Sequence, residues 1–456
     1  MAPTVRSFSA AFEPLDLVAR FPESYPGLLE SGATIVAGRG PRYDILPIAS
    51  GESLRLDSSR SLVGEFANGA GFLSALENWW MALRLPAAAD PADSEPSLPF
   101  TGGWLLYLGY ELAAEIEPCL MMPASSDPVI ALALRAPAAW VCDRATGKAW
   151  LVAEPGYEAL LDELEDRARS LRNLPPSMGA SFAIEEENPE TFLRAVHRAL
   201  EYTAAGDVYQ TNLSRQWQGR AVRQFSPVDI YKRLRGTNPS PYAALLCRPD
   251  FALLSSSPER LVAIRGNSVA TRPIAGTRPR GVTAADDEVL IRSLLNSEKE
   301  RAEHVMLIDL ERNDLGRVCE GGSVRVDEYM SVETYAHVHH IVSNVSGRLR
   351  DGVSPIAVIR ALFPGGTITG CPKVRCMQII SELEACSRGA YTGSIGYLNR
   401  DGSCDLNILI RTITAQGSAV RFRAGAGIVA DSNPAQELAE TRAKAEGMLR
   451  ALDVLR

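Results

Sequence analysis

Two pairs of glutamates stand one helical turn apart: Glu300 with Glu303, and Glu437 with Glu440. Both pairs fall in segments that read as helices, where residues three apart share a face. If two such pairs met, they could hold one hard cation. Mg²⁺ in particular needs few protein carboxylates when waters and an anionic ligand complete its shell. The alternative is two solvated helix faces, with Lys444 forming an ordinary surface ion pair with Glu440.

A second group of residues could bind an anion. The segment Phe363-Pro-Gly-Gly-Thr-Ile-Thr-Gly-Cys-Pro-Lys373 is a loop that opens a helix, whose free N–H groups can receive an anion. It lacks the Gly-Lys-Ser/Thr ending of a nucleotide-binding P-loop. Arg411 follows an apolar strand and is either a strand end at the surface or a buried carboxylate clamp. Residues 423–427 offer further backbone amides.

Three of the five histidines lie within Tyr335-Ala-His-Val-His-His340. On a strand, His337 and His339 would share one face and His340 would lie on the other. These residues could form a metal site, or one of them could be catalytic beside structural neighbours. No cysteine is spaced to complete a zinc site, which favours a single catalytic histidine.

Residues 271–280, Thr-Arg-Pro-Ile-Ala-Gly-Thr-Arg-Pro-Arg, read as a constrained polar turn. Pro273 fixes its own φ and favours an extended residue before it, whereas Gly276 permits a positive φ. With hydroxyls at Thr271 and Thr277, the segment either lines a polar pocket or closes an ordinary hairpin. Together with the carboxylates and the anion-binding features, it indicates a site for a small, multiply anionic molecule plus Mg²⁺.

The composition is that of a soluble globular protein. The 456 residues suffice for two domains or one large intertwined unit. A net charge of −8 and a pI near 5.4 argue against a nucleic-acid or anionic-membrane surface. The N-terminus shows no signal peptide, and residues 104–108, an apolar stretch, are too short to span a bilayer. The eight scattered cysteines are expected to be reduced thiols in the cytoplasm.

The elements that would position these residues form a mixed pattern. Residues 173–189 are the best linker candidate, and they end at a helix start with Asn188 as N-cap and Pro189 at the first helical position. We therefore divide the chain into residues 1–175 and 185–456. Strands are expected at 33–37, 102–110, 138–142, 148–153, 208–217, 242–247, 251–255, 261–264, 269–274, 341–349, 394–398, 404–413 and 420–429. Helices are expected at 72–84, 156–172, 189–205, 286–313 with a break near 296–297, 354–362, 373–385 and 434–452. This alternation predicts an α+β fold with mixed or antiparallel sheets flanked by helices.

In these motifs the sequence resembles the chorismate-utilising enzymes: anthranilate synthase component I, aminodeoxychorismate synthase component I, isochorismate synthase and salicylate synthase. The motifs occur in family order from about residue 190 to 450. They are Gly206-Asp-Val-Tyr-Gln-Thr-Asn-Leu-Ser214, Ser256-Ser-Pro-Glu-Arg260, Arg272-Pro-Ile-Ala-Gly-Thr277, Glu303-His-Val-Met-Leu-Ile-Asp-Leu-Glu-Arg-Asn-Asp-Leu-Gly-Arg317, Phe363 to Lys373, Tyr391-Thr-Gly-Ser-Ile-Gly396 and the closing helix. The resemblance implies an anthranilate synthase component I-like fold in which the two regions intertwine.

The resemblance also implies roles for individual residues. Glu303 and Glu440 would bind Mg²⁺, with Glu437 assisting behind them. Glu259 would be the general acid at the departing C4 hydroxyl of chorismate, and His340 would lie over the ring. Tyr391, Arg411, Lys444 and the amides near Gly425 would hold the substrate carboxylates, with Thr367 nearby. Thr277 would also bind the substrate.

One residue sorts this family by chemistry. Isochorismate and salicylate synthases carry a lysine base where this chain has Gln210. Water needs a base to become a competent nucleophile, and a glutamine amide cannot serve as one. Ammonia is already nucleophilic, so Gln210 points to amination.

The two aminating classes differ at Ala275. Many aminodeoxychorismate synthases have a lysine nucleophile there, in Pro-Ile-Lys-Gly-Thr, whereas anthranilate synthases have alanine. However, residues 363–370, 394–396 and 338–343 resemble the aminodeoxychorismate synthase versions. We therefore expect an alanine-type aminodeoxychorismate synthase component I that makes 4-amino-4-deoxychorismate for p-aminobenzoate and folate biosynthesis. Anthranilate synthase component I is the alternative.

Three further expectations follow. A non-catalytic chorismate-binding relative would have lost Glu259, Glu303 or Glu440, and all three are present. No glutaminase-like cysteine–histidine arrangement occurs, so a separate glutamine amidotransferase subunit would supply ammonia in a heterodimer. Two segments resemble the tryptophan-binding elements of anthranilate synthases, or are plain loop packing. Their residues are Leu29, Glu30, Ser31, Asn238, Pro239 and Tyr242.

Overall fold

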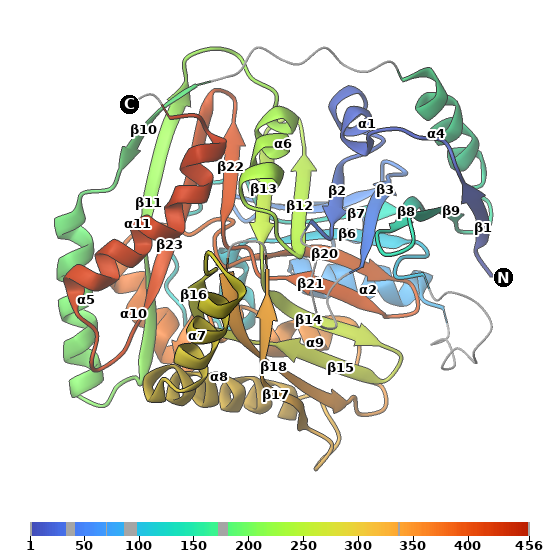
Figure 1. Ribbon diagram of the computed structural model, residues 1–456. Helices are drawn as coiled ribbons and strands as arrows, with labels where there is room; N and C mark the ends of the chain where they lie inside the picture. The colour runs from blue at the N-terminus through green and yellow to red at the C-terminus, as the bar shows by residue number, and fades with distance from the viewer. Residues whose placement is uncertain are drawn as a thin grey trace.

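The computed structural model describes residues 2–32, 42–69, 71–85, 98–171, 181–335 and 338–454. Two large sheets dominate this part of the chain, and their strands pair antiparallel throughout (Figure 1). The first sheet runs in the order β1 (Thr4–Phe8), β9 (Lys148–Ala153), β8 (Ala138–Asp143), β3 (Tyr43–Ile48), β2 (Gly27–Glu30), β12 (Tyr242–Cys247), β13 (Ala252–Ser257), β22 (Thr412–Gln416), β23 (Ala419–Ile428), β11 (Gln210–Ala221) and β10 (Phe182–Glu186), with β19 (Gly370–Cys371) beside β11. The second runs β16 (Ile274–Pro279), β18 (Val338–Arg348), β15 (Ser268–Arg272), β14 (Arg260–Arg265), β21 (Cys404–Asn407), β20 (Ser394–Asn399), β6 (Gly103–Leu108), β7 (Val129–Ala136), β4 (Ser53–Asp57) and β5 (Leu62–Gly64), with β17 (Arg325–Thr334) beside β18.

Both sheets run across the expected boundary near residue 180. In the first sheet β2 pairs with β12, and Leu28 lies opposite Leu245. In the second, β6 pairs with β20, and Leu105 lies opposite Tyr397. The division into 1–175 and 185–456 stays a prediction, but the strands of the two regions share the same two sheets.

The helices begin and end where local signals predict. Asn188 accepts a hydrogen bond from the Glu190 amide and Pro189 opens α5. The expected break at 296–297 separates α7 from α8, and Ser297 caps the second helix. The helices are α1 (Pro14–Arg20), α2 (Phe72–Leu83), the 3₁₀ turn η1 (Tyr110–Leu112), α3 (Ala113–Ile116), α4 (Ala159–Ser170), α5 (Pro189–Ala204), α6 (Pro227–Thr237), α7 (Ala284–Leu295), α8 (Glu298–Gly316), α9 (Pro355–Leu362), α10 (Lys373–Glu384) and α11 (Pro434–Ala451).

The core lies in layers, because successive side chains of a strand face opposite sides. On β6, Leu105 and Tyr107 join a cluster with Leu246 and Leu253 of the other sheet, so this cluster fills the space between the sheets. Leu106 of β6 faces the opposite way, into a cluster that includes residues of α2 and α9. A third cluster packs α1, α4, α6 and α11 on the first sheet. The continuous apolar run at 103–108 therefore marks a strand buried on both faces, as the sequence suggests.

Two expected strands are broken at residues that matter for the site. The strand expected over 269–274 ends at Arg272, and Pro273 separates β15 from β16. The strand expected over 404–413 is wrong as a single element, because β21 ends at Asn407 and β22 begins at Thr412. Arg411 lies in the gap with a left-handed φ of 51°. Such a backbone is unusual for a side-chain-bearing residue and marks constrained sites.

Several expectations lie partly or wholly outside the described residues: the strand at 33–37, residues 173–180 of the linker expected at 173–189, and His337. The rest of that expected linker includes strand β10. The elements that had no counterpart in the sequence-based prediction are strands β1, β2, β3, β4, β5, β7, β10, β17 and β19 and helices α1, α3 and α6. Among the described residues, none of the helices is long and apolar enough to cross a membrane. The α+β architecture with large antiparallel sheets is confirmed.

Candidate active site

Glu259 lies between β13 and β14, where the chain passes from the first sheet to the second. It is 5% exposed, and the Thr367 hydroxyl donates a hydrogen bond to its Oε1 at 2.6 Å. Burial raises the pKa of Glu259 to about 7, although Thr367 and the charges of Lys444 and Arg411 favour the carboxylate. A carboxyl group with this pKa is partly protonated at neutral pH and can serve as a general acid.

His340 on β18 is a buried, neutral imidazole. Burial, followed by the nearby charge of Arg411, lowers its pKa to about 3. Its Nδ1 lies 2.9 Å from the Thr277 hydroxyl and 3.4 Å from the Gly276 carbonyl oxygen. Its Nε2 is buried, and no described group hydrogen-bonds to it. On β18, Ile341 pairs with Ala275 and His340 pairs with Thr277. Residues 275–277 therefore lie beside His340.

The two glutamate-bearing helices α8 and α11 approach each other at Glu303 and Glu440. The pKa of Glu303 is raised by burial, with further contributions from the charges of Glu300 and Glu440. Burial also raises the pKa of Glu437, which is 7% exposed and feels the charge of Glu440. Opposed carboxylates on two helices are a donor set that a divalent cation would fit.

Lys444 stands beside these carboxylates. Its Nζ lies 2.6 Å from Glu440 Oε1, as the surface-pair alternative predicts, but it also donates to the Gly425 carbonyl at 3.0 Å. Within the described ranges, no three acidic, histidine or cysteine side chains cluster as a metal site. A cation here would therefore take two carboxylates from the protein and its remaining ligands from substrate and water, as Mg²⁺ commonly does.

Gly425 and Tyr391 face each other across a narrow gap. A Cβ built on Gly425 would stand 2.5 Å from the Tyr391 hydroxyl, so a larger residue would collide there. The Ser214 amide opposite Gly425 donates to Glu384 instead of to the Gly425 carbonyl. The polar groups of Gly425 therefore point away from β11, and its carbonyl accepts from Lys444.

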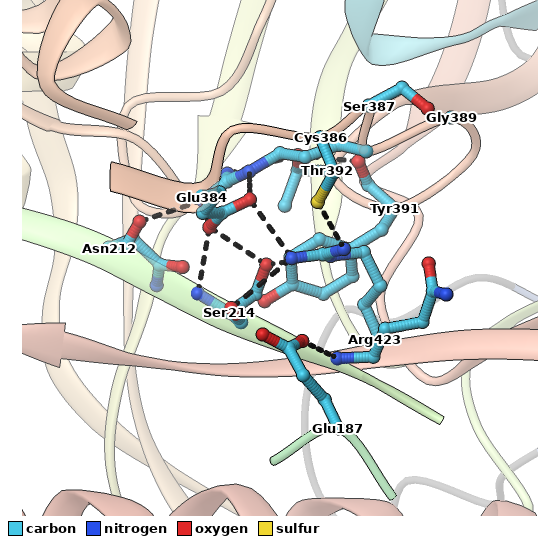
Figure 2. Close-up of polar contacts among 12 residues, drawn as sticks. Glu187, Asn212, Ser214, Glu384, Cys386, Ser387, Gly389, Tyr391, Thr392 and Arg423 are labelled. Atoms are coloured by element: carbon cyan, nitrogen blue, oxygen red, sulfur yellow. Dashed lines mark hydrogen bonds and ion pairs between the residues drawn. The ribbon is translucent and has the colours of Figure 1, made fainter. Parts of the chain in front are cut away.

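A buried ionic network fixes this corner of the site (Figure 2). The Glu384 carboxylate accepts from the Ser214 amide at 2.8 Å and the Ser214 hydroxyl at 2.9 Å. It also accepts from Arg388 at 2.6 Å and from Arg423 at 3.1 Å. The network ties β11, β23 and the end of α10 together, and so sets the loop that carries Tyr391. Sequence reasoning missed it, and its one local signal is the i,i+4 spacing of Glu384 and Arg388.

The N-terminal region holds the other side of that loop. Glu111 accepts from the backbone amide of Arg388 at 2.7 Å, and Asp127 accepts from the amide of Ala390 at 3.1 Å. Burial raises the pKa of Glu111 to about 7. These contacts join residues more than 250 positions apart, and the sequence analysis assigned no role to either carboxylate.

Glu311 on α8 is a further buried carboxyl group that had no predicted role. Burial, and then the charge of Asp314, raises the pKa of Glu311 to about 8, and Glu259 adds a smaller contribution. Glu311 is 5% exposed. The site therefore contains a second carboxyl group that is largely protonated at neutral pH.

Gln210 begins β11 beside β19, where it pairs with Cys371. Its side chain is 2% exposed and lies over Gly427, since a Cβ on that glycine would stand 2.4 Å from Gln210 Nε2. No described group hydrogen-bonds to its Oε1. The position at which isochorismate and salicylate synthases would carry a lysine base therefore holds a buried amide side chain in this protein.

A separate cavity of about 120 Å³ lies where β2 meets β12. Four of the residues assigned to a tryptophan-like ligand site line it, namely Leu29, Glu30, Ser31 and Tyr242, and the ligand itself stays a prediction. Asn238 and Pro239 are not among its lining residues, and the Asn238 amide instead donates to the Ser256 hydroxyl at 3.2 Å.

Comparison with known proteins gives a consistent result. A family model described as chorismate binding enzyme matches residues 36–450. The chain belongs to the chorismate-binding enzyme family. It is 44% identical over 397 residues to aminodeoxychorismate synthase component 1 of Bacillus subtilis (strain 168). The aligned region covers 84% of this chain and 82% of that protein.

Other members of the family are similar over even more of the chain. Anthranilate synthase component 1 of Neisseria meningitidis serogroup B is 39% identical over 461 residues, covering 94% of this chain and 90% of that protein. The crystal structure of anthranilate synthase component I from Streptococcus pneumoniae TIGR4 superposes with a TM-score of 0.77 at 30% identity, covering 91% of this chain and 94% of that one. The protein is thus a chorismate-utilising enzyme with the expected fold.

Proposed function

We propose that this family member is an aminodeoxychorismate synthase component I, which aminates chorismate to 4-amino-4-deoxychorismate for p-aminobenzoate and folate biosynthesis. The observation that carries the proposal is the buried amide of Gln210, which has no hydrogen-bonding partner at Oε1 among the described residues. A glutamine cannot deprotonate water, whereas ammonia attacks without a base. The 44% identity to the Bacillus subtilis enzyme supports the choice between the aminating classes.

The first step is a substitution with a shift of the ring double bonds. The lone pair of ammonia bonds to C2, the two conjugated double bonds move, and the C4–O bond breaks. Glu259, which its pKa of about 7 leaves partly protonated, gives its proton to the departing hydroxyl, which leaves as water. The new ammonium group at C2 releases a proton through solvent, which restores Glu259. The product is 2-amino-2-deoxyisochorismate, held without a covalent bond to the protein.

The second step reverses the shift. Another ammonia bonds to C4, the double bonds move back, and the C2–N bond breaks. The C2 amine leaves as ammonia with the proton released by the incoming nitrogen. Ala275, buried beside His340, leaves the space at C2 that a lysine nucleophile fills in other members of the family.

Glu303 and Glu440 would hold Mg²⁺, with Glu437 supporting them. When bound, the ion would neutralise a carboxylate of chorismate. Tyr391, Arg411, Lys444 and the amide of Gly425 would hold the other carboxylate, and His340 and Thr277 would contact the ring. The close approach of Tyr391 to Gly425 and the contact of Lys444 with the Gly425 carbonyl support this assignment.

Anthranilate synthase component I is the second candidate, favoured by Ala275 and by the 39% identity to the Neisseria meningitidis protein. In that case pyruvate would be eliminated from the 2-amino intermediate instead of the second amination. Incubation with chorismate, Mg²⁺ and ammonium, followed by mass analysis, separates the two. We expect 4-amino-4-deoxychorismate, and anthranilate with pyruvate as the main products would refute the assignment.

We also propose that ammonia comes from a separate glutamine amidotransferase subunit in the cytoplasm, bound as a heterodimer. The cavity lined by Leu29, Glu30, Ser31 and Tyr242 would hold a tryptophan-like ligand. Its wall carries both carboxylates and guanidinium groups, among them Glu30 and Arg42, which supports a ligand with both an amine and a carboxylate. Glu30 is also engaged by Arg235 at 3.0 Å and by the Tyr231 hydroxyl at 2.7 Å. Neighbouring Asp44 has its pKa raised to about 6, chiefly by burial.

A further inference from the structure

Two side-chain amides on β11 present unsatisfied acceptors. Gln210 is 2% exposed and Asn212 is 8% exposed. The carbonyl oxygens Gln210 Oε1 and Asn212 Oδ1 are both buried, and neither has a hydrogen-bond donor among the described residues. Leaving such an acceptor unpaired destabilises the folded protein. Two of them in adjacent same-face positions of one strand indicate a ligand that donates hydrogen bonds.

The two amides pack closely over two glycines of β23. A Cβ built on Gly427 would stand 2.4 Å from Gln210 Nε2, and one built on Gly425 would stand 3.0 Å from Asn212 Oδ1. Gly425 and Gly427 are alternate residues of β23, so their missing side chains would point the same way. The same Gly425 position is 2.5 Å from the Tyr391 hydroxyl. The amides and the tyrosine hydroxyl therefore lie close together over the sheet.

The charges around these groups favour a neutral ligand. Lys444 donates to the carbonyl of Gly425 at 3.0 Å, and the Arg388 guanidinium lies 5.4 Å from the Tyr391 ring. Both cations are ion-paired, Lys444 with Glu440 at 2.6 Å and Arg388 with Glu384 at 2.6 Å, and so leave no net charge to bind an ion. The amide oxygens, in turn, need hydrogen-bond donors. A neutral molecule with several N–H donors satisfies both conditions. Ammonia has three such donors and one lone pair.

We infer that Gln210 and Asn212 together form the ammonia subsite, in which the two amide oxygens accept N–H groups and leave the lone pair free to attack. This inference rests on the proposed amination and adds Asn212 as a positioning residue. Amide oxygens suit the task because they hold N–H groups without removing protons. The Asn212 backbone is fixed independently, since its carbonyl accepts from Arg388 at 2.7 Å, and its side chain can therefore be changed alone.

The test is steady-state kinetics of the full chain with ammonium salts, measuring KM for ammonia and for chorismate separately. Asn212→Leu removes the acceptor at nearly constant volume. We expect KM for ammonia to rise about three- to tenfold, the value of one hydrogen bond, with KM for chorismate changed less than twofold. Asn212→Asp keeps an acceptor oxygen and should bring KM for ammonia back to within about threefold of wild type. Thr211→Val is the matched control, because this buried neighbour on the opposite face contacts Cys376 and should change neither KM.

Three results would overturn the inference. KM for ammonia could stay unchanged in Asn212→Leu, or KM for chorismate could rise instead, which would assign Asn212 to the substrate. A wild-type protein that converts no chorismate would refute the proposed function, and the subsite with it. Anthranilate as the product would refute only the choice of class, because that reaction also consumes ammonia. If Asn212→Leu does not unfold cooperatively on heating, Asn212→Ala removes the same acceptor with a smaller side chain.

Discussion

Replacing Thr367 by valine tests whether Glu259 is the general acid. The Thr367 hydroxyl donates to Glu259 Oε1 at 2.6 Å, and this bond favours the charged carboxylate. Without it, the pKa of Glu259 should rise above its value of about 7. A hydrogen bond to a charged group contributes about 1.5–3 kcal/mol, which at about 1.4 kcal/mol per pKa unit corresponds to a rise of one to two units.

The assay is the pH dependence of kcat/KM for chorismate, which reports groups of the free enzyme. The free ammonia concentration is held constant at each pH. Because the reaction needs protonated Glu259, wild-type activity should fall as pH rises through about 7, and Thr367→Val should move this fall to a higher pH by about one to two units. Thr369→Val is the matched control, because Thr369 is in the same loop but donates to the Gly365 carbonyl.

The fall of kcat/KM at high pH is called the basic limb of the profile. If the midpoint of this limb is unchanged in Thr367→Val, or moves to lower pH, the assignment of Glu259 as general acid is refuted. A loss of kcat without a shift of the limb would show that Thr367 binds substrate and does not tune the acid. A shift of the limb in Thr369→Val of the same size would point to a general disturbance of the loop.

Four further predictions can be checked with simple measurements. Glu440→Gln should raise the Mg²⁺ concentration needed for half-maximal activity at least tenfold, and an unchanged Mg²⁺ titration would remove Glu440 from the cation site. Ala275→Lys should permit a covalent adduct with chorismate, visible in the intact-protein mass; repeated absence of the adduct counts against the placement of residues 271–280. Gly425→Ala should reduce kcat/KM for chorismate at least tenfold, because its Cβ would stand 2.5 Å from the Tyr391 hydroxyl, and near-normal kinetics would contradict that contact. Titration calorimetry should show L-tryptophan binding that is lost in Tyr242→Ala if the cavity beside β2 is a ligand site, whereas no heat with either protein would identify it as packing.

Local signals explain most of what the sequence predicted. Asn188, Pro189 and Ser297 carry their own capping chemistry, so α5 and the break before α8 were expected at the right residues. The motifs around Glu259 and Glu303 are contiguous and could be matched residue by residue. The α+β class followed from the same local patterns.

The missing parts depend on contacts between distant residues. The Glu384–Arg423 pair and the anchoring of the 388–390 loop by Glu111 have no contiguous sequence pattern. The break at Arg411 was also missed, because an apolar run followed by an arginine and a further β-branched run reads as one strand. Left-handed backbone at such a residue is imposed by tertiary structure and is not readable from propensity.

Two carboxylates of the N-terminal region help to position the loop that carries Tyr391. Glu111 and Asp127 accept the amides of Arg388 and Ala390, and the next residue is Tyr391. From the other side, Glu384 receives Arg388, and Asn212 receives the same guanidinium through its backbone carbonyl. The loop that presents Tyr391 is therefore held between the N-terminal region and β11. Since an error of about 1 Å in such a placement can cost about a hundredfold in rate, the N-terminal region acts as part of the active-site scaffold, and the catalytic motifs alone would not build the site.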